Sequence, residues 1–100
     1  MTREMLMYER FYHDEVPNHF RIQYILLTDE LSFGGNTLEI YGIKIKLFQD
    51  GAFIEQKALR GITPFSTRIT AMLNLMADSL VTPVGMADVV TDLMRSSFQA

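Results

Sequence analysis

Residues 62–94 read ITPFSTRITAMLNLMADSLVTPVGMADVVTDLM and contain the same helix-start signal twice. The signal is Thr63-Pro64 and again Thr82-Pro83. The threonine hydroxyl can accept a hydrogen bond from the free backbone N–H groups at a helix start, and proline suits the first helical position because no N–H donor is needed there. Apolar residues at helical spacing follow each signal. They are Ile69, Met72, Leu73, Met76 and Leu80 after the first, and Met86, Val89, Val90, Leu93 and Met94 after the second. We therefore predict two amphipathic helices, 64–80 and 83–97, that meet at a tight corner.

Four segments typical of β-strands precede this region, at 5–13, 20–28, 38–48 and 52–59. Asp50-Gly51 supplies the positive φ angles of a tight hairpin turn, and residues 14–18 form a polar turn. The composition of residues 29–37, DELSFGGNT, indicates a loop. Strands followed by helices favour an α+β fold: a four-stranded antiparallel sheet followed by two C-terminal helices packed on one face (ββββαα), in a single domain over residues 1–100.

Two helices can cover only one face of such a sheet. We expect them to cover the face that carries Tyr24, Leu26, Ile43 and Ile45. The other face would then present a candidate interface to water, made of Ile25, Leu27, Leu38 and Ile40. Exposed apolar patches of this kind usually mark an interface. Either a homodimer forms through this face, or the 29–37 loop folds back with Leu31 and Phe33 to cover it.

The overall composition excludes several classes of function. Apolar residues make up 48% of the chain, the net charge is −3, and Lys and Arg form no block, so we predict no nucleic-acid partner. Stretches of membrane-spanning length are lacking, so we predict no membrane partner. The N-terminal segment has no uninterrupted apolar core of a signal peptide, and the chain has no cysteine. These features favour the cytoplasm.

Tyr41-Gly42-Ile43, the Ile62-Thr63 helix start, and Val81-Thr82-Pro83 followed by Asp88-Val89-Val90 form a distinctive combination. Over about residues 41–94 the chain resembles a small family of bacterial proteins of roughly 100 residues whose function is unknown. The resemblance supports the predicted fold. It implies no activity, cofactor or catalytic residue.

His13, Asp14, Glu15 and His19 are the only concentration of metal-ligand residue types. Imidazole nitrogens and carboxylate oxygens could bind zinc or manganese if a turn brought them together. Their spacing matches no established motif, and a solvated turn accounts for them better. Gly34-Gly35 precedes a predicted strand and not a helix, so it is a poor phosphate loop. We predict no catalytic residue, no metal and no cofactor.

The leading hypothesis is a small cytoplasmic protein-interaction or regulatory module without catalytic activity, whose partner is a second copy (a homodimer) or another protein. The alternative is a small inhibitor or ligand-binding protein of mobile-element origin that acts on a larger protein target. A third, weaker possibility is an enzyme or metal site built around His13 and His19.

Overall fold

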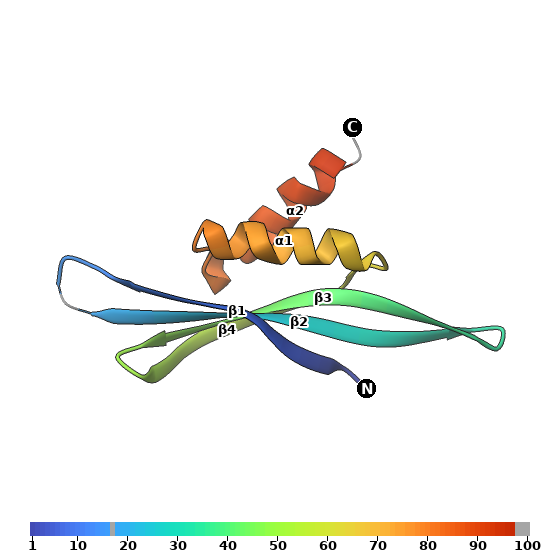
Figure 1. The fold of residues 1–100 in the computed structure, drawn as a ribbon, viewed down its shortest axis with the longest axis horizontal. Coiled ribbons are helices and arrows are strands. Elements are labelled where there is room, and N and C mark those ends of the chain that lie inside the picture. Colours follow the sequence, from blue (N-terminus) through green and yellow to red (C-terminus); the bar gives the residue numbers. More distant parts are fainter. Residues whose placement is uncertain (17, 98–100) are drawn as a thin grey trace.

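The computed structural model describes residues 1–16 and 18–97 and confirms the predicted fold class. Its four strands are β1 (Arg3–His13), β2 (His19–Phe33), β3 (Asn36–Gln49) and β4 (Ala52–Thr63), and they form one antiparallel sheet in the order β1-β2-β3-β4. The helices α1 (Ser66–Asp78) and α2 (Met86–Ser97) follow, separated by the short 3₁₀ turn η1 (Pro83–Gly85). Figure 1 shows both helices on one side of a strongly twisted sheet.

The expectation of a loop at 29–37 is wrong. β2 continues to Phe33 and β3 begins at Asn36, so only two residues connect these strands. Gly34 and Gly35 have φ angles of 50° and 86° and form a tight turn, as Asp50 (49°) and Gly51 (83°) do between β3 and β4. The alternation of apolar and polar residues continues to this turn, and it outweighs the loop-like composition. The resulting hairpin extends past the end of α1 (Figure 1).

The two helix-start signals have different outcomes. The Thr63 hydroxyl accepts a hydrogen bond from the backbone N–H of Phe65 (3.2 Å), just before α1. For Thr82 the prediction of a side-chain cap is wrong, because its hydroxyl caps no N–H group among the described residues. The backbone carbonyl of Thr82 accepts the N–H of Gly85 instead (3.1 Å), and α2 starts only at Met86.

The corner between the helices is built on backbone hydrogen bonds. α1 ends at Asp78, and Leu80 follows with φ at 53°, a conformation usually taken by glycine. The N–H groups of Leu80 and Val81 then donate to the carbonyls of Ala77 (3.3 Å) and Met76 (3.0 Å). This arrangement satisfies the last carbonyls of α1 and reverses the chain.

The core lies between the helices and one face of the sheet, as predicted. Tyr24, Ile43 and Ile45 are fully buried there, and Leu26 packs against them partly buried. Leu73 is the fully buried leucine that α1 contributes. The hydroxyl of Tyr24 donates to the carbonyl of Val81 (2.8 Å), which ties the sheet to the helix corner. Burial raises the pKa of Tyr24 to about 12.

Candidate functional site

The face of the sheet opposite the helices, called here the far face, is where the sequence predicts an interface. Leu38 is 46% exposed and Ile40 is partly exposed, as expected. The expectation that Ile25 and Leu27 face water is wrong, because they are only 6% and 2% exposed. The 29–37 segment does not cover them either, since it lies in the hairpin.

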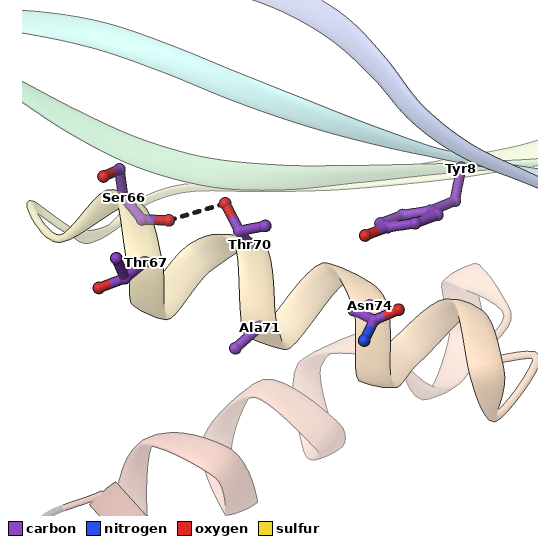
Figure 2. A pocket seen from close by; sticks show the side chains of 6 residues that line it. All are labelled: Tyr8, Ser66, Thr67, Thr70, Ala71 and Asn74. Atoms are coloured by element: carbon purple, nitrogen blue, oxygen red, sulfur yellow. Dashed lines mark hydrogen bonds between the residues drawn. The ribbon is translucent and has the colours of Figure 1, made fainter.

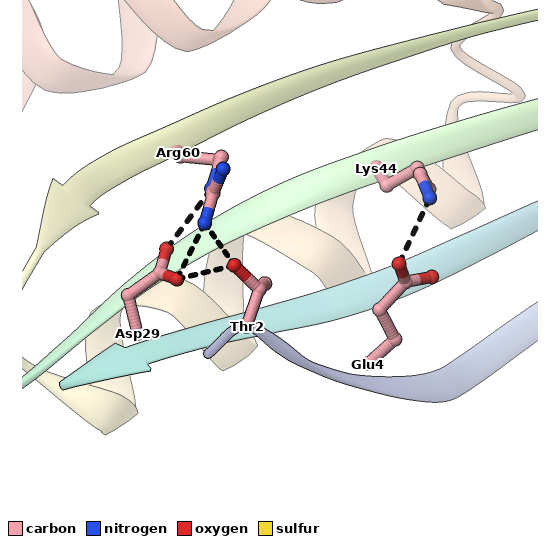
Figure 3. Close-up of polar contacts among 5 residues, drawn as sticks. All are labelled: Thr2, Glu4, Asp29, Lys44 and Arg60. Carbon is pink, nitrogen blue, oxygen red and sulfur yellow. Dashed lines mark hydrogen bonds and ion pairs between the residues drawn. The ribbon is translucent and has the colours of Figure 1, made fainter.

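Figure 3 shows two ion-paired bridges on the far face. The strand pairing places Ile25 and Leu27 beside them. Lys44 on β3 pairs with Glu4 on β1 (Nζ–Oε2 3.0 Å) and so spans β2. Glu4 lies directly across from Leu27, and Lys44 directly across from Ile25. Only 17% of the Lys44 side chain is exposed, because its aliphatic part lies along the sheet. The neighbouring strands therefore cover these two apolar residues with their own side chains.

The second bridge joins β4 to β2 across β3. Arg60 donates from Nε to Asp29 Oδ2 (3.2 Å) and from Nη2 to Asp29 Oδ1 (2.8 Å), and the hydroxyl of Thr2 bonds to both residues. These hydrogen bonds lower the pKa of Asp29 to about 2, and the hydrogen bond with Arg60 has the largest effect. Gly42 lies on β3 at this crossing, and a side chain there would collide with the carbonyl of Leu59, at 2.3 Å. Glycine is required at this position of the sheet.

Beyond the second bridge, the hairpin carries an exposed apolar surface. The pairing of β1 with β2 begins at Thr28 and that of β4 with β3 begins at Tyr41, so residues 29–40 form a two-stranded extension. Leu31 faces Leu38 across the strands, and Phe33 follows at the tip with 64% of its surface exposed. These three residues, called here the hairpin patch, lie on the far face. Glu30, Ser32, Thr37 and Glu39 occupy the opposite face of the same hairpin.

A second apolar surface lies at the other end of the far face. Here four residues lie directly across from one another, one on each strand, and we call them the aromatic row. They are Phe11, Arg21, Phe48 and Phe53. Phe11 is 69% exposed, and Phe53 is 54% exposed. The guanidinium of Arg21 lies 4.3 Å from the centroid of the Phe48 ring and 3.9 Å from the carboxylate of Glu9. Aromatic residues and arginine are the types enriched in protein interfaces.

The polar cluster of the sequence is only partly brought together. His13 and His19 are cross-strand neighbours with stacked rings whose centroids are 6.4 Å apart. Asp14 is engaged in its own turn, because its carboxylate accepts the N–H of Asn18 (3.2 Å), and Glu15 is exposed. Among the described residues, no three His, Cys, Asp or Glu side chains are grouped to hold a metal ion. Arranged in this way, the cluster offers two imidazoles to solvent.

On the helix side of the molecule, an open groove of about 410 Å³ lies between β1 and α1. Tyr8 projects from β1 toward a stripe of α1 residues (Figure 2), which are Ser66, Thr67, Thr70, Ala71 and Asn74. The hydroxyl of Thr70 already donates to the carbonyl of Ser66 (2.8 Å). The six residues that line this groove supply no carboxylate or imidazole to act as a general base.

Fold and surface together define a small α+β domain with a one-sided helical layer and a far face whose two ends are apolar. The chain belongs to a family of unknown function, DUF6514, whose model matches residues 3–96. Neither the curated proteins nor the solved structures gave a match. Within the described residues, no helix is long and apolar enough to cross a membrane.

The aromatic row and most of the hairpin patch are absent from the candidate interface that the sequence predicts. Leu31 and Phe33 continue the alternation of β2 on the side of Ile25 and Leu27, and Gly34-Gly35 is a possible two-residue turn, so the sequence contained a signal for the hairpin. The aromatic row depends on the register of all four strands, which no local pattern specifies.

Proposed function

We propose that this chain is a small cytoplasmic protein-interaction module that regulates or connects proteins and performs no catalysis. Its contact surface is the far face, and its partner is a second copy or another protein. The observation that carries this proposal is the hairpin patch, in which Leu31, Phe33 and Leu38 project into solvent from strands whose opposite face is polar. Such a surface adds little to the stability of the single chain, whereas a partner can bury it.

The chemistry of the other candidate sites supports this proposal. The groove at Tyr8 has a neutral lining, and the pair His13 and His19 is surrounded by aromatic side chains and a turn. The composition supports a cytoplasmic location, since a chain without cysteine suits the reducing cytoplasm.

The proposal can be tested by photo-crosslinking in cells. A photoreactive amino acid is placed at Leu38 in one variant and at Thr37 in a matched control, because these neighbours point to opposite faces of the same strand. We expect covalent protein adducts from position 38, formed with a second copy or with another protein, and few from position 37. Equal adduct yields from the two positions would contradict the proposal.

A further inference from the structure

We infer that the partner of the far face is a second copy of this chain, related by a two-fold axis that runs across the strands. The hairpin patch of each chain then lies on the aromatic row of the other. This inference rests on the proposed function and names its partner. Three features carry it: the apolar area, the twist of the sheet and the distribution of charge.

The apolar area matches that of a stable dimer. Six large apolar side chains of the far face are between 37% and 69% exposed. They are Leu6, Phe11, Leu31, Phe33, Leu38 and Phe53. Because an aromatic side chain buries about 150–250 Å², their exposed parts add up to on the order of 500 Å² per chain. A standard interface buries about 800 Å² per partner, of which somewhat more than half is apolar. A face-to-face dimer that uses both ends of the far face reaches this size, and one that uses the hairpin alone does not.

The twist of the sheet permits this packing. A twisted sheet is unchanged in shape by a two-fold rotation about an axis that lies in the plane of the interface, either along or across the strands. Two far faces therefore remain parallel to each other along their whole length in both arrangements. Closed two-fold pairing is also the commonest form of homo-oligomer.

Charge disfavours a two-fold axis that runs along β2 and is compatible with one that runs across the strands. An axis along β2 places each residue of that strand against its own copy, so the two Arg21 side chains come together, and so do the two Asp29 side chains. An axis across the strands at the level of Leu26 places Arg21 against Leu31 and Gln23 against Asp29. Like charges that face each other across an interface cost several kcal/mol. The crosswise arrangement avoids both of these contacts.

In the same register, the hairpin of each chain packs against the aromatic row of the other. Leu26 pairs with Ile43, and on β3 the positions equidistant from Ile43 are Leu38 and Phe48. Leu38 of one chain therefore meets Phe48 of the other. Phe11 and Phe53 stand on the outer strands at that level, so the two-stranded hairpin fits between their exposed rings.

The first test is the molar mass measured by light scattering at high micromolar concentration. We expect a dimer for the wild type and at least a tenfold weaker dimer for Leu38→Ser and for Phe53→Ser. Leu75→Ser is the matched control, because Leu75 lies on α1 and has the same 46% exposure as Leu38. This control is expected to remain dimeric. Circular dichroism confirms that each variant is folded.

Disulfide trapping tests the arrangement directly, because the natural chain has no cysteine. Leu38→Cys and Phe48→Cys are prepared separately and mixed under mild oxidation. The crosswise axis predicts a cross-linked heterodimer in the mixture and little cross-linking of either variant alone. Efficient self-cross-linking of Leu38→Cys would show hairpin-on-hairpin packing and overturn the crosswise arrangement.

A wild-type protein that stays monomeric overturns the inference as a whole. The proposed function fails separately, when position 38 gives no more adducts in cells than position 37. A monomer that still forms adducts at position 38 with a different protein would refute the second copy as partner and leave the interaction surface in place.

Discussion

Two stretches of the same strand, the centre of β2 and its hairpin end, carry the same alternating pattern and differ in burial. Ile25 and Leu27 lie on the far face and are nearly inaccessible to water, whereas Leu31 and Phe33, on the same face, are exposed. The helices cover neither stretch, because they lie on the other side of the sheet (Figure 1).

The difference comes from the neighbouring strands. At the centre, Glu4 of β1 pairs with Lys44 across β2, and Arg60 of β4 pairs with Asp29 across β3 (Figure 3). Past Thr28 the pairing with β1 has ended, and the ion pair that reaches farther along the hairpin, between Arg3 and Glu39, lies on its opposite face. Long side chains of a sheet can thus shield its apolar residues from water on a face that no helix covers. Apolar residues that lie outside this cover, such as Leu31 and Phe33, require another explanation.

The largest effect is expected on the face that the helices cover. Leu73→Ala should lower the free energy of unfolding by about 2–5 kcal/mol, because Leu73 is fully buried between α1 and the sheet. Leu75→Ala, in the same helix but exposed, should cost less than about 0.5 kcal/mol. Urea unfolding measures both. A loss below about 0.5 kcal/mol for Leu73 would place it outside the core.

The comparison within β2 predicts the next effect. Leu27→Ala should cost about 2 kcal/mol, near the lower end for a buried leucine, because its cover consists of flexible side chains. Leu31→Ala should cost less than about 0.5 kcal/mol when measured at low micromolar concentration. Because Leu27 is buried, Leu27→Glu should destabilise the fold itself. Equal losses at positions 27 and 31 would remove the distinction between the two stretches.

Tyr24 tests how the sheet is joined to the helix corner. Tyr24→Phe should cost about 1 kcal/mol, because the carbonyl of Val81 loses its donor. The pKa of Tyr24 is raised to about 12 in the fold, from its ordinary value of 10.0. Between these values the unfolded chain loses the proton first, so wild-type stability should fall as the pH rises from 10 toward 12. Tyr24→Phe should fall less over the same range, and identical slopes would contradict the burial of the phenol.

The bridge at the boundary of the hairpin should show its effect in acid. The pKa of Asp29 is lowered to about 2 in the fold, from its ordinary value of 3.8. As the pH falls, the unfolded chain takes up the proton first, so this contribution to stability is present above about pH 4 and is lost between pH 4 and 2. Asp29→Asn should lack this part of the acid dependence. Parallel stability curves for the two proteins would show that the bridge does not form in solution.

The sequence predicts the fold well where signals are local. Asp50-Gly51 and the helical spacing after Thr63 give the last hairpin and α1 nearly as observed. The prediction from sequence is wrong at 29–37, where the loop-like composition and the alternating pattern disagree. It is also wrong at Thr82, where the same Thr-Pro signal as at Thr63 has a different structural environment. Only Leu38 and Ile40 of the candidate interface are accessible as predicted. The burial of Ile25 and Leu27 depends on ion pairs between residues up to 40 positions apart in the chain, which periodicity does not reveal.

Hydrogen exchange followed by mass spectrometry at several protein concentrations tests most directly whether the hairpin end is the surface that a second chain covers. Amides of the strand centre, residues 22–27, should be protected equally at all concentrations, because the single chain covers them. Amides of residues 29–40 should exchange quickly at low concentration and slow by at least tenfold as the dimer forms. Protection of the hairpin that does not change with concentration would contradict the account.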